Sequence, residues 1–81
     1  MPESIDFVVN GRPMSLTRAG VIRSMHGIAS DPIRHHRVLV GERSYPVKQV
    51  FERATGLDRL DFTSAVARRH LLKLGFEVTR G

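Results

Sequence analysis

The chain has 81 residues, 41% of them hydrophobic, and a chain of this length builds one small core. Its 13 basic and 8 acidic residues give a formal net charge of +5, and the lack of cysteine excludes disulfides, thiolate metal ligands and a thiol nucleophile. No apolar run reaches the roughly 18 residues of a membrane span, and residues 1–4 lack the character of a signal peptide, so we expect one cytoplasmic domain over residues 1–81 with no membrane partner.

The N-terminal segment predicts a β-hairpin. Asn10-Gly11 tolerates the positive φ angles of a tight turn and follows a partly alternating run at residues 5–9. Pro13 cannot donate a hydrogen bond to a neighbouring strand, so the returning strand is expected to be short and to lie at an edge.

A first helix is expected after this hairpin, capped by Ser15 or Thr17 and ended by Gly27. Gly20 lowers the helix propensity by up to about 1 kcal/mol relative to alanine, so this helix depends on packing. Its apolar positions follow helical spacing at Ala19, Ile22 and Met25, beside Val21 and Ile28.

The middle of the chain predicts a second hairpin and a second helix. Residues 36–40 have strand character, and Gly41-Glu42-Arg43 is expected to turn the chain back into Ser44-Tyr45. Pro46 suits the first turn of a helix, where its missing amide hydrogen would have no partner, and Gly56 should end that helix. Its apolar face comprises Val47, Val50, Phe51 and Ala54, while Lys48, Gln49, Glu52 and Arg53 are expected to face out.

The last third of the chain predicts a connector, a third helix and a closing strand. Leu57 and Leu60 are expected to attach the connector to the core, and Thr63 or Asp61 to cap the helix. Residues 76–80 alternate as a strand that can pair with the middle hairpin.

The third helix should end at Gly75 and have one apolar and one basic face. His70 lies on the apolar face and is expected to be a core histidine with a hydrogen-bond partner. Leu72 projects among the basic residues, where it suits either a thymine methyl group or a dimer contact. Successive steps of 100° place Val66, Ala67, His70, Leu71 and Leu74 on the first face, and Ala65, Arg68, Arg69, Leu72 and Lys73 on the second.

Together these elements predict a single α+β domain with three helices and short antiparallel hairpins. The order helix, hairpin, helix, connector, helix, strand is close to that of a winged helix, in which one helix supports a second that lies against DNA. The connector from Gly56 to Phe62 is longer than the tight turn of a helix-turn-helix, and amphipathic helix pairs also pack many proteins that never touch DNA.

Eleven of the thirteen basic residues are arginine, whose planar guanidinium suits phosphate groups and guanine edges, so double-stranded DNA is the first expected partner. The protein is then expected at the nucleoid. The competing interpretation of these charges is a solvated surface with no ligand. The candidate DNA-binding residues are Arg68, Arg69 and Lys73 of the third helix, Lys48 and Arg53 of the second, and Arg34, His35, His36, Arg37 and Arg43 of the middle hairpin.

Two other classes of function compete with DNA binding. The histidines invite a metal site or a histidine-dependent nuclease, but no cysteine or patterned carboxylate accompanies His35-His36 and nothing brings His26 to His36. We therefore expect no metal, no cofactor and no enzyme activity. The other class is a protein-interaction or antitoxin-like module that dimerises or caps a partner through Leu72 and the edge of the N-terminal hairpin.

Tyr45-Pro46-Val47-Lys48, an alanine-bearing helix and Leu74-Gly75-Phe76-Glu77-Val78 resemble a small module found beside bacterial restriction-type and HNH nucleases. The resemblance covers residues 38–78. It implies a non-catalytic domain that recognises plain or modified DNA for a nuclease, with roles for Tyr45 and Lys48. The histidines do not reproduce an HNH motif, so the resemblance implies a regulator or an accessory subunit, with a nuclease or a toxin as its protein partner.

Overall fold

The computed structural model describes residues 3–33 and 36–80, and its elements follow the order that the sequence predicts. The described chain holds three helices and antiparallel strands, so the α+β class is confirmed. The elements are β1 (Ser4–Val9), β2 (Arg12–Thr17), α1 (Arg18–Ser24), β3 (His36–Val40), β4 (Arg43–Pro46), α2 (Val47–Thr55), the 3₁₀ turn η1 (Arg59–Asp61), α3 (Ser64–Lys73) and β5 (Glu77–Arg80).

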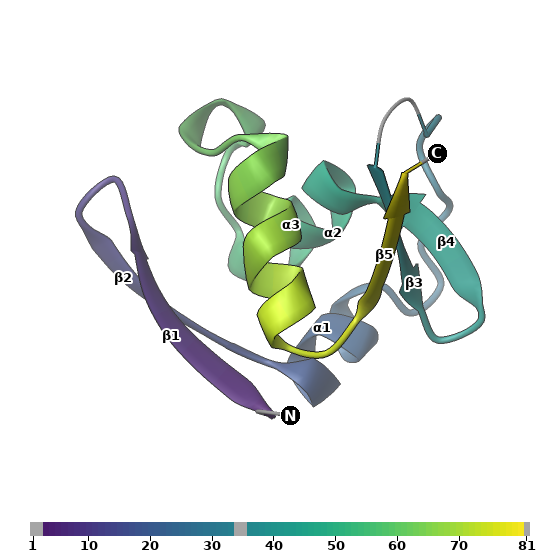
Figure 1. Cartoon of the computed structure of the whole chain (residues 1–81), viewed down its shortest axis with the longest axis horizontal. Coiled ribbons are helices and arrows are strands. Elements are labelled where there is room, and N and C mark those ends of the chain that lie inside the picture. The colour runs from purple at the N-terminus through teal and green to yellow at the C-terminus, as the bar shows by residue number, and fades with distance from the viewer. Residues whose placement is uncertain (1–2, 34–35, 81) are drawn as a thin grey trace.

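The strands form two separate sheets, one of which stands beside the helices α2 and α3 as a winged-helix-like arrangement requires (Figure 1). In this sheet β3 lies between β4 and β5, with Leu39 opposite Ser44 on one side and Glu77 on the other. The predicted pairing of the closing strand with the middle hairpin is therefore confirmed. The other sheet is the β1–β2 hairpin, and β2 is longer than Pro13 suggested because a two-stranded sheet leaves one side of each strand unpaired.

Turns and helix caps lie where short-range signals place them. Asn10 and Gly11 have φ angles of 51° and 76°, the left-handed conformation that a tight hairpin turn demands. Gly56, at φ 76°, ends α2 with its N–H bonded to the carbonyl of Glu52. The hydroxyl groups of Thr17 and Thr63 cap α1 and α3, each by accepting a hydrogen bond from the backbone N–H of the residue three positions later in the chain.

The core joins α2, α3, the three-stranded sheet and one face of the N-terminal hairpin. Phe51 is fully buried, with Phe62 at 4.8 Å and Phe7 of β1 at 5.6 Å between ring centroids. Each such buried apolar side chain contributes about 1.5–3 kcal/mol. The buried hydrophobic residues are Val9, Leu16, Val21, Met25, Val38, Val40, Tyr45, Val47, Val50, Phe51, Leu57, Phe62, Ala67, Leu71, Leu74 and Phe76. Among the described helices, none combines the length and the apolarity that a membrane crossing needs.

Three local predictions are wrong. Helix α1 ends at Ser24 with Met25 as its C-cap, before the predicted stop at Gly27. Pro46 is the last residue of β4 and the N-cap of α2, not part of the helix's first turn. Leu57 is buried as expected, but Leu60 is 93% exposed. The reason is the carboxylate of Asp58, which accepts a hydrogen bond from the Leu60 N–H at 2.9 Å and so begins the turn η1. This turn directs the leucine away from the core.

Candidate nucleic-acid interface

Helix α3 has the two faces that its sequence predicts. Ala67, His70 and Leu71 are buried against the core. On the other side Arg69 and Lys73 are exposed. Packing of the buried face therefore fixes the position of the helix backbone, and the opposite face exposes cations to solvent.

Arg68, which is half-buried, connects α3 to the start of β3. Its Nη1 lies 3.1 Å from Nε2 of His36. His36 stands opposite Arg80 of β5, and the neighbouring Arg37 donates from its Nε to the hydroxyl of Thr79 at 3.1 Å. Basic residues from three elements thus lie at one end of the sheet, with Arg37 on the face opposite to His36 because consecutive strand residues alternate. We call the set Arg37, Arg68, Arg80 and His36 the basic cluster.

A groove of about 360 Å³ opens beside the basic cluster, between the N-terminal ends of α2 and α3. Lys48 stands at its wall with its ammonium nitrogen 5.5 Å from the centroid of the Phe62 ring, a cation–π contact that steadies the long side chain. The groove is large enough for a phosphate group. Its lining residues are Asp31, Pro32, His36, Pro46, Val47, Lys48, Arg59 and Ser64.

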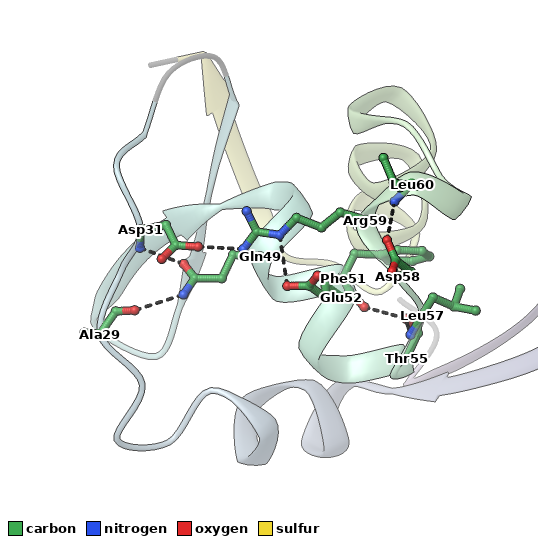
Figure 2. Close-up of polar contacts among 10 residues, drawn as sticks. All are labelled: Ala29, Asp31, Gln49, Phe51, Glu52, Thr55, Leu57, Asp58, Arg59 and Leu60. Carbon is green, nitrogen blue, oxygen red and sulfur yellow. Dashed lines mark hydrogen bonds and ion pairs between the residues drawn. The ribbon is translucent and has the colours of Figure 1, made fainter.

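Arg59 forms ion pairs with two carboxylates near this groove (Figure 2). Its guanidinium lies 2.6 Å from the carboxylate of Asp31 and 2.9 Å from that of Glu52. The hydrogen bonds to Asp31 and then to Glu52 raise the pKa of Arg59 above its ordinary value. These two contacts are the ion pairs within residues 3–33 and 36–80, so over that part of the chain the arginines of the basic cluster are not neutralised by a carboxylate.

Gln49 fixes the loop that leads into β3, and Figure 2 shows it between that loop and Arg59. Its side-chain nitrogen donates to the carbonyl of Ala29, and its oxygen accepts from the N–H of Asp31, both at 2.9 Å. Gln49 is only 5% exposed, so the prediction that it faces out is wrong. Helical periodicity missed it because a chain segment distant in sequence covers this part of α2.

We expect Gln49→Leu to lower the free energy of unfolding by about 1–2 kcal/mol, because two backbone groups lose their side-chain partners. Urea unfolding measures this loss, and amide chemical shifts report whether residues 29–33 move. Arg53→Leu is the matched control, since Arg53 is an exposed residue of the same helix and should change stability by no more than about 0.5 kcal/mol. Equal effects of the two substitutions would show that Gln49 does not hold the loop.

The other predicted DNA-binding residues are spread over the molecule. Arg34 and His35 lie outside the described residues. Arg43 is exposed at the β3–β4 turn, the opposite end of β3 from His36. Arg53 is exposed in the last turn of α2, away from Lys48 in its first turn. The structure therefore brings together only part of the predicted set.

Tyr45 does not belong to the interface. It is 3% exposed, and its hydroxyl lies 3.5 Å from the carbonyl oxygen of Met25. Its ring is part of the core beneath the β3–β4 hairpin. Such burial leaves no surface for contact with DNA, and this assignment is corrected.

Among the described residues the histidines do not come together, and the predicted pair His35-His36 lies partly outside them. His26 and His36 line different cavities. Within the described ranges no group of three or more histidine, aspartate and glutamate side chains is placed to hold a metal ion. His70 is buried as predicted, but its Nδ1 has no hydrogen-bond partner among the residues that the structure describes, which corrects the expectation of a satisfied core histidine.

Fold and surface together define a small α+β domain with a basic cluster at one end of a three-stranded antiparallel sheet. Residues 6–81 match the family model described as SCO5918-like, and the chain belongs to this family. Comparison with curated proteins and with solved structures gives no match.

Proposed function

We propose that this protein binds double-stranded DNA without catalysing a reaction, as a regulator or as the recognition subunit of a larger machinery. The observation that carries the proposal is the basic character of one end of the sheet, where Arg68 of α3 contacts His36 of β3 and Arg80 of β5 stands opposite the same histidine. Like charges at one end of a sheet repel one another, and a bound anion would offset that repulsion. A phosphate backbone is an extended anion of this kind.

The charge distribution supports a polyanionic ligand. The carboxylate of Asp31, which lines the groove, and that of Glu52 are both paired with Arg59. On the described part of the chain no carboxylate pairs with the guanidinium groups of the basic cluster, and Arg69 and Lys73 are exposed. Arginine can also bind a guanine edge through two parallel hydrogen bonds, so the same residues suit both backbone and base contacts.

The shape of α3 supports duplex rather than single-stranded DNA. Its ten residues make a rod about 15 Å long, which fits along a major groove about 12 Å wide. Leu72 is 50% exposed among the cations and suits contact with a thymine methyl group. The end of the β3–β5 sheet would then meet the adjacent phosphates, much as a wing does.

Titration of a labelled duplex of about 20 base pairs at about 50 and 200 mM salt tests the proposal. If four phosphates are neutralised, the logarithm of the association constant should fall with the logarithm of salt concentration with a slope of about −3.6. Fluorescence anisotropy measures both values. Absent binding, or a slope near zero, would contradict DNA binding. Tighter binding of an RNA hairpin or of polyglutamate than of the duplex would assign the basic cluster to another polyanion.

The interaction module considered from the sequence stays a prediction. Leu72 is exposed on α3, as a dimer contact through it requires. An exposed leucine of this size is common on monomeric proteins and does not by itself favour dimerisation.

A further inference from the structure

A second cavity, of about 770 Å³, lies between α1 and the β3–β4 turn, away from the basic cluster. Buried Met25, Val40 and Tyr45 contribute to its walls, and Ile22, 41% exposed, adds a further apolar side chain. Its charged groups are mainly basic, Arg23 and Arg43 against the single acid Glu42. The cavity therefore suits an apolar group that is accompanied by negative charge. We call it the α1 groove.

The turn η1 presents an apolar side chain accompanied by negative charge. Leu60 is 93% exposed at its centre, and Asp58 and Asp61 stand on either side of it in the chain. The turn is fixed at both ends, because Asp58 accepts from the Leu60 N–H and the side chain of Asn10 donates to the Asp61 carbonyl at 3.1 Å. Figure 2 shows Asp58 and Leu60 on this turn. An exposed leucine alone needs no explanation, but this one is held on an ordered acidic turn.

We propose that Leu60 of one copy of the chain occupies the α1 groove of a second copy. The apolar side chain would cover Ile22 and the groove walls, while Asp58 and Asp61 approach Arg23 and Arg43 at the rim. The signs of charge are complementary, and the fixed turn η1 limits the entropy lost on binding. A single anchor of this kind gives a weak contact, with a dissociation constant on the order of 100 μM.

The two surfaces lie at different ends of one molecule. In Figure 1 the connector that precedes α3 is at the top of the view, whereas α1 and the β3–β4 turn are at the bottom. A chain cannot fill its own groove, so the contact is head-to-tail and can continue from copy to copy. The groove contains no residue of the basic cluster, so self-association leaves that cluster free. Arg43, predicted from the sequence as a DNA contact, belongs instead to the groove.

Sedimentation of the full chain from about 10 μM to about 1 mM tests the contact. The average mass should rise with concentration past that of a dimer, because each added copy presents a new groove. Leu60→Gln should hold the protein at the monomer mass of 9.1 kDa over the same range. Leu72→Gln, which also removes an exposed leucine, should leave the association unchanged. A wild type that stays monomeric at the highest concentration overturns the proposal, and so does association that is lost with Leu72→Gln but kept with Leu60→Gln.

Mixing two variants distinguishes a head-to-tail contact from a symmetric one. Leu60→Gln has an intact groove, and Arg23→Glu/Arg43→Glu has an intact turn η1, so neither should associate alone. Their equimolar mixture should form a one-to-one dimer and grow no further. The two surfaces left free on this dimer are the substituted turn and the substituted groove, which cannot bind another copy. A mixture that stays monomeric while the wild type associates overturns the proposal. DNA is absent from these experiments, so their outcome is independent of the proposed DNA binding.

Discussion

Arg68→Ala/Arg69→Ala is expected to bind a DNA duplex about 10- to 100-fold more weakly than the wild type at about 100 mM salt. The salt dependence should also become shallower by about two units of slope, because two phosphates lose their cations. Arg68 contacts His36 rather than a carboxylate, and Arg69 is exposed, so the substitutions leave no buried charge unpaired. Fluorescence anisotropy gives the affinity, and urea unfolding should show a free energy within about 0.5 kcal/mol of the wild type.

The matched control is Arg12→Ala/Arg23→Ala, which removes the same two charges from exposed positions in β2 and α1. If α3 is the interface, this control should weaken binding by no more than a few-fold through the lower net charge. The comparison is made at nanomolar protein, far below the concentrations at which self-association is expected. Equal weakening by the two double variants would mean that binding follows net charge alone and that α3 does not contact the duplex.

The parts of this fold that could be predicted from the sequence are those fixed by a few neighbouring residues. Asn10 and Gly11 both adopt positive φ, and this local demand identified the hairpin. Thr63 and Gly75 mark the ends of the third helical segment in the same short-range way. The separation of His70 from Arg69 onto different faces of α3 follows from helical geometry alone.

The parts that could not be predicted depend on contacts between distant segments. Arg68 and His36 are 32 residues apart, and only the packing of α3 on the sheet brings them together. Arg80 was missed because its place beside His36 depends on the register between β5 and β3. Hydrophobic side chains are buried on average, which predicted a buried Leu60. The side chain of Asp58, two residues earlier, accepts a hydrogen bond from the Leu60 N–H and so turns the leucine outward. Periodicity contains no information about these contacts.

The position of Arg43 shows why net charge is a poor guide to one site. It was grouped with Arg37 because both belong to the middle hairpin. The strand β3 separates them, with Arg37 at the start and Arg43 beyond the turn at its end. A five-residue strand spans about 16 Å, more than a Debye length at physiological salt, so the two charges act on separate surfaces.

His70 is the titratable group whose surroundings in the described structure most oppose its charged form. It is 7% exposed and stacks on Phe7 at 4.2 Å between ring centroids, with Phe51 at 5.8 Å. Burial, followed by the nearby positive charges of Arg69 and Lys73, lowers the pKa of His70 below its ordinary value of 6.5. The imidazole is therefore expected to be neutral in the folded protein at pH 7.

This lowered pKa gives a pH dependence of stability with a defined sign. As pH falls below about 6.5, the unfolded chain takes up a proton at His70 before the folded chain does, so the free energy of unfolding decreases. The decrease continues until the pH reaches the folded-state pKa, below which both states are protonated. Above about pH 6.5 the imidazole is neutral in both states and adds no slope.

His70→Phe is expected to raise the free energy of unfolding by about 1 kcal/mol or more and to reduce its loss at acid pH. A phenyl ring keeps the stacking on Phe7 and removes the buried Nδ1, which lacks a hydrogen-bond partner in the described part of the chain. Urea unfolding of both proteins at pH 5 and pH 8 measures the effect, because carboxylate titration is common to both and cancels in the difference of differences. The same loss in wild type and variant would contradict the account. So would an NMR titration of the wild-type imidazole with a pKa at or above 6.5, since a histidine that charges so readily would have to be solvated in the folded state.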